Sequence, residues 1–361
     1  MSPEPPPAVL ERILALRPTS AAQRLGDSTL PLLNPRDLAR ALDGPAVPLV
    51  CVPVPALEAI PGLLRAARDE DAVLGLAAPY QPEHRDAADR FFEALRAAAE
   101  ECHHRRPVFL QAGPIRLTSA EPRGLQLRAE DVFRYVDAGF SLVSVDCSAL
   151  VPEAGVMVAS ELVQAAVERE LSVEIAAPVD ESGRARAAAL QTCLEGFASK
   201  RVGVRFVRVR STQLVAEGEG GAGEGAGANL DLPALRELSE VARRFGAWLT
   251  VEEVGTSTRA LPGWGPAGAR KVDLGAPFAR VVLSALEPDM RASLKVRAIA
   301  TSIPTWELLA QFGDPLQEAP AGAREKVEAL SYAEALELLE QAGAHGSATA
   351  AMAFLAEQAG Y

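Results

Sequence analysis

Residues 129–177 read AEDVFRYVDAGFSLVSVDCSALVPEAGVMVASELVQAAVERELSVEIAA and contain two copies of the pattern that decides the fold. Two short, mostly apolar runs, Leu142 to Cys147 and Leu171 to Ala177, each follow a segment with helical periodicity, at 129–137 and 158–170. Runs of this kind are typical of strands buried on both faces, as in parallel sheets covered by helices. The stretch therefore predicts alternating helices and parallel strands.

The same alternation continues in both directions along the chain. Eight strands are predicted at 47–54, 72–78, 107–112, 142–147, 171–177, 204–210, 248–254 and 271–274. Helices are predicted at 56–68, 85–101, 129–137, 158–170, 184–199, 232–245 and 278–286. Because eight strand–helix units can close and leave no sheet edge, the sequence predicts an α/β protein with a (β/α)8 TIM barrel. The alternative is an open doubly wound sheet, but no Gly-x-Gly-x-x-Gly follows the first strand.

Segments at both ends of the chain fall outside these units. We expect an N-terminal extension with a helix at 1–46, the barrel at 47–296 and a C-terminal helical extension at 297–361. These additional C-terminal helices are predicted at 305–311, 332–341 and 348–358. Their apolar stripes contain Leu336, Leu339 and Leu355, which must pack on the barrel or on another chain. We therefore expect a homo-oligomer, or a partner protein bound through the C-terminal helices.

Composition limits the classes of partner and location. Hydrophobic residues make up 48% of the 361 residues, enough for a large core, and the formal net charge is −12. That charge disfavours binding to nucleic acid. No run of about 18 apolar residues is present, and the N-terminus lacks the pattern of a signal peptide, so we expect no membrane contact and a cytoplasmic location. The four cysteines form no Cys-x-x-Cys pair, which favours reduced, buried thiols.

Residues 217–228, which read EGEGGAGEGAGA, form an acidic low-complexity segment after the sixth predicted strand. In a barrel, this segment would lie over the C-terminal mouth. It could act as a lid, but it has no apolar side chain large enough to dock, which favours a tolerated insertion.

Several segments resemble the class II fructose- and tagatose-bisphosphate aldolases. Tyr135-Val136-Asp137-Ala138-Gly139-Phe140-Ser141 leads into Val143-Ser144-Val145-Asp146-Cys147-Ser148, which resembles the family's helix-to-strand signature. Leu230-Asp231-Leu232 and Lys271-Val272-Asp273-Leu274-Gly275 are similar to later segments of the family, and Ala112-Gly113-Pro114 is similar to its non-catalytic tagatose-bisphosphate aldolase subunit. The resemblance covers residues 47–290 and implies a barrel of sugar-phosphate metabolism.

The family's chemistry, as the resemblance implies it, needs a zinc ion held by three histidines and an Asp that moves a proton. The corresponding positions here are the stretch from Gln111 to Pro114, Gln213 and Glu252. The histidines lie elsewhere, as surface or helix-terminal residues: His84, His103, His104 and His345. We therefore predict no metal site and no cofactor. Lys271 is expected to begin the eighth strand at the lower end of the barrel, where a Schiff-base role is disfavoured.

Polar residues nevertheless gather on or after the predicted strands, where barrels place their active sites. The candidate catalytic residues are Asp146, Glu174 and Glu252. The candidate ligand-binding residues are Gln111, Ser148, Arg210, Gln213, Gly255, Thr256, Ser257, Asp273 and Gly275. The segment from Gly255 to Ser257 resembles the family's phosphate loop, which implies a small phosphorylated ligand. The carboxylates could alternatively hold a hard cation, or pair with a mouth arginine such as Arg210, and we favour the pairing.

Three hypotheses for function follow. The first is an aldolase-like barrel of the sugar-phosphate metabolism type that lacks metal-dependent catalysis and acts as a non-catalytic homologue or accessory subunit. The second is an active sugar-phosphate lyase or isomerase with a rebuilt, metal-independent acid/base site. The third is a structural component of an assembly.

Overall fold

The strands close into a barrel in a computed structural model that describes residues 4–214, 230–253, 261–301, 308–309, 316 and 321–359. All neighbouring strands are parallel and follow one another in chain order, and β8 pairs with β1 to complete the circle. The strands are β1 (Leu49–Pro53), β2 (Leu74–Ala78), β3 (Val108–Arg116), β4 (Leu142–Asp146), β5 (Ser172–Ala176), β6 (Phe206–Arg210), β7 (Trp248–Glu253) and β8 (Ala269–Leu274). The predicted TIM barrel is confirmed, and the open doubly wound sheet is wrong.

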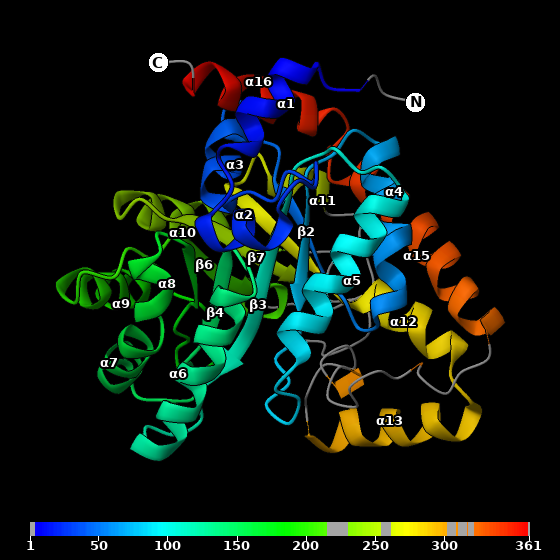
Figure 1. Cartoon of the computed structure of the whole chain (residues 1–361). Coiled ribbons are helices and arrows are strands. Elements are labelled where there is room, and N and C mark those ends of the chain that lie inside the picture. The colour runs from blue at the N-terminus through cyan, green and yellow to red at the C-terminus, as the bar shows by residue number, and fades with distance from the viewer. Residues whose placement is uncertain are drawn as a thin grey trace.

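Helices surround the barrel, as Figure 1 shows. Those that follow the strands are η1 (Leu57–Ala59), α4 (Ile60–Asp69), α5 (Ala87–Glu101), α6 (Pro122–Asp137), α7 (Pro152–Leu162), α8 (Gln164–Glu168), α9 (Ala187–Ser199), η2 (Ser211–Leu214), α10 (Leu232–Arg244), α11 (Leu261–Trp264) and α12 (Ala276–Ala285). The ends of the chain add α1 (Pro7–Leu14), α2 (Thr19–Leu25), α3 (Pro35–Leu42), α13 (Pro288–Thr301), α15 (Ala321–Gln341) and α16 (Ser347–Gln358).

Two of the predicted helices differ most from the observed ones in their bounds. Helix α6 begins at Pro122, several residues before the predicted start, and the predicted helix at 158–170 is divided into α7 and α8. Proline is favoured at the first position of a helix, where its fixed φ suits the helix and its missing N–H is not needed. Both early starts have a proline at this position, and the first turn of α6 is largely exposed, so it lacks an apolar period.

The ends of the chain contain more helix than predicted. Helices α1 to α3 precede β1, where one helix was expected, and α13 spans the predicted boundary at residue 296. The predicted C-terminal helices at 332–341 and 348–358 correspond to α15 and α16. Of the predicted helix at 305–311, only Leu308 and Leu309 are described, and both are buried. The proposed domain boundaries remain predictions.

The lower end of the barrel is apolar and closed. Side chains from the first positions of the strands, including Leu49 and Phe109, pack in one cluster with Leu38 of α3 and Leu355 of α16. In Figure 1, α1, α3 and α16 lie together at this end of the barrel, which is at the top of the picture. The ring of Phe109 also fills the space beside Gly75, where an added Cβ would lie 2.1 Å from its Cζ. Only the opposite end, at the carboxyl ends of the strands, is therefore available for a site.

The apolar stripes of the C-terminal helices pack on this chain itself. Leu339 is part of the main core and Leu336 packs against it. Helix α15 lies so close to α4 that a Cβ at Gly62 would be 2.2 Å from the carbonyl oxygen of Glu328. These residues do not need another chain to be buried, so the expected oligomer loses this argument and remains a prediction.

Candidate functional site in the barrel interior

Alternation along the strands places a set of polar side chains inside the upper half of the barrel. They are Gln111, Ser144, Asp146, Glu174, Arg208, Arg210, Thr250, Glu252, Lys271 and Asp273. All except Arg210 are buried. Their charged side chains form two layers, a lower and an upper one. The contacts within each layer decide which groups are available for chemistry at the mouth.

The lower layer is centred on Lys271, which is completely buried. Its Nζ lies 2.8 Å from Glu174 Oε2 and 2.7 Å from Asp273 Oδ1. Ser144 Oγ and Thr250 Oγ1 donate hydrogen bonds to the two oxygens of Glu174, at 2.7 and 2.8 Å. Because every member has a partner of opposite charge or a hydrogen-bond donor, burial of the charges is compensated.

The pKa values of this layer follow from burial and from the neighbouring charges. Burial raises the pKa of Asp273 to about 6, and the charge of Glu174 adds to this effect against the opposing ammonium of Lys271. Burial also opposes ionisation of Glu174, but Lys271 and Arg208 outweigh it and lower its pKa. Burial would lower the pKa of Lys271, yet Asp273 and Glu174 raise it. Lys271 is therefore held as an ammonium, which is not a nucleophile.

The predicted position of Lys271 needs a correction. Strand β8 begins at Ala269, so Lys271 is not its first residue. Its Cα pairs with Leu49 at the start of β1, so the residue does lie low in the barrel. Its side chain, however, enters the interior and reaches Glu174. The lysine is a structural counter-ion within the candidate site.

The upper layer is centred on Arg208, whose side chain is only 2% exposed. Its Nη1 donates to Glu252 Oε2 at 2.8 Å and its Nη2 donates to Asp146 Oδ2 at 3.0 Å. Asp146 Oδ1 also accepts hydrogen bonds from the backbone N–H and the hydroxyl of Ser148, at 3.1 and 2.6 Å. Burial would raise the pKa of Asp146, but Arg208 and these bonds lower it to about 2.

Arg210 forms the rim of the same layer. Its Nε lies 3.2 Å from Glu252 Oε2, and its Nη2 lies 3.6 Å from Asp146 Oδ2. Pairing of the carboxylates with mouth arginines is thus observed for Asp146 and Glu252, whereas Lys271 performs this role for Glu174 and Asp273. Arg208 was not among the site residues predicted from the sequence. The alternation of Phe206, Arg208 and Arg210, which places all three on one face of β6, could have indicated it.

The remaining predicted site residues are dispersed. Gln213 lies in η2, where its Oε1 accepts a hydrogen bond from the backbone N–H of Arg210 at 2.9 Å. Gln111 is buried inside β3 and accepts a 3.7 Å contact from Cys51 Sγ. Gly275 is the residue before α12. Gly255, Thr256 and Ser257 lie outside the described residues.

In the class II aldolases that the sequence resembles, three histidines would hold zinc. The residues at the corresponding positions here do not fit that metal. Glu252 is engaged by two guanidinium groups, Gln213 by a backbone N–H, and Gln111 has an amide oxygen where an imidazole is expected. Within the described part of the chain, His, Cys, Asp and Glu side chains form no group of three that could hold a metal ion.

His84 lies in the loop between β2 and α5, and one of the other histidines is more than a helix-terminal residue. His104, just beyond the end of α5, is only 1% exposed, and burial lowers its pKa to about 4. His345 contacts Glu70 at 3.0 Å on the surface. His104 is therefore a neutral core residue at ordinary pH.

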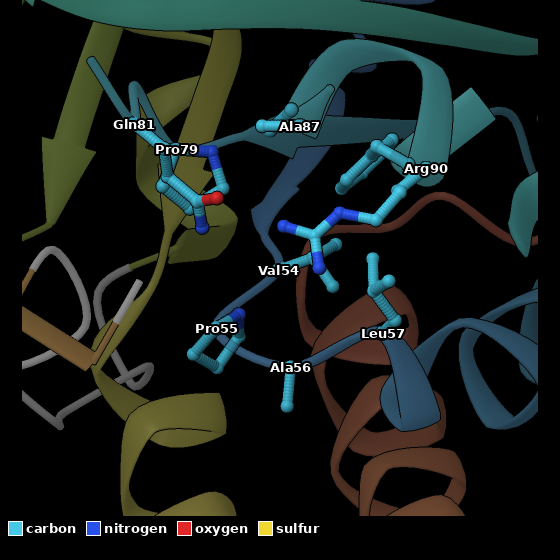
Figure 2. A pocket seen from close by; sticks show the side chains of 10 residues that line it. Val54, Pro55, Ala56, Leu57, Pro79, Gln81, Ala87 and Arg90 are labelled. Atoms are coloured by element: carbon cyan, nitrogen blue, oxygen red, sulfur yellow. The ribbon is translucent and has the colours of Figure 1, made fainter. Parts of the chain in front are cut away.

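A small cavity lies beside the ends of β1 and β2, against the first turns of α5, and Figure 2 shows its lining. Val54, Pro55 and Leu57 form an apolar wall, and the guanidinium of Arg90 and the amide of Gln81 point toward the space. Arg90 Nε lies 3.1 Å from Asp86. The cavity holds about 30 Å³, which is room for about one water molecule and too little for a sugar phosphate.

No helix in the described ranges is long and apolar enough to cross a membrane. No protein-family model matches the sequence, and no curated protein matches it significantly.

Solved structures do match the fold. The YdjI aldolase from Escherichia coli K12 superimposes with a TM-score of 0.60 at 13% identity, covering 88% of this chain and 99% of that one. Fructose-bisphosphate aldolase (Fba) from Campylobacter jejuni superimposes with a TM-score of 0.59 at 12% identity, covering 86% of this chain and 96% of that one. At these identities the likeness extends to the fold alone, and it confirms at that level the resemblance found in the sequence: the chain has the (β/α)8 fold of these aldolases.

Proposed function

We propose that the chain is a non-catalytic, aldolase-like barrel that binds a small phosphorylated ligand at its mouth. The observation that carries the proposal is the pairing of Arg208 and Arg210 with Asp146 and Glu252 at the centre of the mouth. A metal-dependent aldolase needs a Lewis acid and a free base at this place. Here two guanidinium groups take the central position and engage the carboxylates.

Proton transfer by these acids is disfavoured by their partners. A general base works best when its pKa lies near the working pH and when it can reach the substrate. Asp146 has a pKa of about 2 and is held by Arg208 and Ser148. Glu174 is completely buried under Lys271, Ser144 and Thr250. Neither carboxylate meets both conditions.

Binding of an anion is favoured instead. The cation that forms the rim of the upper layer, Arg210, is an arginine, whose planar donors match a phosphate better than the single charge of a lysine does. The YdjI and Fba structures with the same fold are described as aldolases, and Fba is named for a bisphosphate sugar. These neighbours support a sugar phosphate as the ligand class.

The test combines an activity assay with a binding assay on the same purified protein. Triose phosphate release from fructose and tagatose bisphosphates, measured with and without added zinc, should not exceed background. The same sugar phosphates should raise the melting temperature in proportion to occupancy.

Any other result of these two assays would favour one of the two remaining hypotheses. Turnover that disappears in Glu174→Gln or Asp146→Asn would support a metal-independent lyase or isomerase. If neither turnover nor a melting shift occurs at millimolar ligand, the proposal fails and a structural role in an assembly becomes the better hypothesis.

A further inference from the structure

We propose that the outward edge of Arg210 is the subsite that receives the phosphate monoester group of the ligand, with Gln213 as its positioning residue. This inference rests on the proposed function and names the group that would recognise the anion. It differs from the segment from Gly255 to Ser257, which the family resemblance suggests.

The first step is that both buried carboxylates have a nearer partner than Arg210. Arg208 reaches both of them, at 2.8 Å to Glu252 and 3.0 Å to Asp146, and Asp146 has two further donors from Ser148. The side chains of Asp146 and Glu252 are each only 7% exposed. Arg208 therefore bonds to both acids at shorter distances than Arg210 does, although its one positive charge balances only one of the two carboxylates.

The second step is that Arg210 is held loosely and faces solvent. Its side chain is 33% exposed, and its contacts with the two acids, at 3.2 and 3.6 Å, are longer than those of Arg208. In the part of the chain that the structure describes, its Nη1 forms no hydrogen bond. A guanidinium has five N–H donors in a rigid fork, so several donors of Arg210 remain for an incoming anion.

The third step is that the backbone beneath this side chain is fixed. Gln213 Oε1 accepts from the backbone N–H of Arg210 at 2.9 Å, just where β6 ends and η2 begins. This bond joins the last residue of the strand to a side chain of the turn that follows it. Gln213, predicted as a ligand-binding residue, thus acts through Arg210 by holding the end of the strand that carries it.

The fourth step concerns the chemistry of the ligand. Arginine and phosphate form parallel, charge-assisted hydrogen bonds that are about twice as strong as neutral ones. A carboxylate could accept the same fork but carries less charge. The side chain of Arg210 is 33% exposed and those of its two acids only 7%, so a phosphate dianion meets Arg210 before it meets Glu252.

The test measures binding of glycerol 3-phosphate and inorganic phosphate by calorimetry, with acetate as the carboxylate probe and glycerol as the neutral one. The variants are Arg210→Ala, Arg210→Lys and Arg243→Ala. Arg243 is the matched control because its side chain is 44% exposed and pairs with one acid, Asp43, on the outside of the barrel. All measurements use the full chain.

Wild type and Arg243→Ala should bind glycerol 3-phosphate equally, and Arg210→Ala should weaken binding by about 10- to 100-fold. Arg210→Lys keeps the charge but loses the fork, so its affinity should fall between the two. This variant also serves if Arg210→Ala does not fold. Gln213→Ala should weaken phosphate binding with little change in melting temperature.

The outcomes separate this inference from the proposed function. If wild type binds phosphate esters and Arg210→Ala binds them equally well, the subsite is wrong while the function stands. If acetate binds as well as glycerol 3-phosphate, the ligand group is wrong. If wild type binds no phosphate compound at millimolar concentration, both the subsite and the function fail.

Discussion

Replacing Lys271 with methionine should destabilise the barrel strongly, because it removes the ammonium between two buried acids. Methionine fills a similar volume and leaves Glu174 and Asp273, which lie within 2.8 Å of Nζ, without their cation. Glu174 keeps its bonds from Ser144 and Thr250, and Asp273 can take up a proton because its pKa is already about 6. One uncompensated charge therefore remains, and removing one partner of a buried pair costs about 3–5 kcal/mol.

The loss should depend on pH, and its sign follows from the direction of the shift. Without Lys271, the folded-state pKa of Asp273 rises further above its ordinary value, and the pKa of Glu174, which Lys271 lowers in wild type, rises as well. A group with a raised folded pKa contributes stability at low pH that is lost as the pH rises through the folded value. The deficit of Lys271→Met should therefore be larger at pH 8 than at pH 5, by about 1.4 kcal/mol per pH unit for each proton concerned.

Urea titrations at the two pH values measure this free energy of unfolding for wild type, Lys271→Met and Lys326→Met. Lys326 is the control because it is exposed and donates to the carbonyl oxygen of Ser284, at 3.3 Å, and not to a buried acid. Its replacement should change stability by less than about 0.5 kcal/mol. Adding Glu174→Gln to Lys271→Met should recover part of the loss. The reasoning is refuted if Lys271→Met costs no more than the control, or if its deficit is the same at pH 5 and pH 8.

Four further predictions concern other features. The stability of wild type should fall as the pH rises from 4 to 6, because the folded pKa of Asp273 lies near 6 and its ordinary value is 3.8. Asp273→Asn should remove this fall, and urea titrations across the same pH range measure it. Gly75→Ala should cost about 1–3 kcal/mol in the same assay, since its Cβ would meet the ring of Phe109, whereas Gly124→Ala, with open space around it, should not. Deleting 217–228 should change stability by less than about 2 kcal/mol, because closure entropy varies slowly with loop length, and a larger loss would mean that the segment is docked. Untagged protein should not contain stoichiometric zinc by elemental analysis, and finding it would contradict our interpretation of the donor positions.

Much of the fold could be predicted from the sequence because each strand carries its own signal. The eight apolar runs are local features, and their number fixes a closed barrel once the helices between them are recognised. The first residue of a helix was harder to predict where the first turn is exposed, as at Pro122, because an exposed turn has no apolar period.

The site could be predicted only in part, because its pairings cross the barrel. The acids Asp146, Glu174 and Glu252 were recognised by their place on the strands, and all three lie in the interior. Their partners depend on which strands face each other, and Lys271 meets Glu174 across 97 residues of sequence. Arg208 was missed because it was treated as part of a buried apolar run, although its alternation with Arg210 places both on the inner face.

The closed apolar floor of the barrel has a consequence for how the chain folds during synthesis. Phe109 and Leu49 of the floor are covered by Leu38 of α3, which precedes the strands in the sequence, and by Leu355 of α16, which follows them. Because α16 is synthesised after all eight strands, the floor of a nascent barrel lacks part of its cover until α16 has emerged. Contacts of such long range form slowly, and partly folded chains with exposed apolar surface aggregate. The yield of folded protein should therefore respond more to chaperone supply and growth temperature than its equilibrium stability alone would suggest.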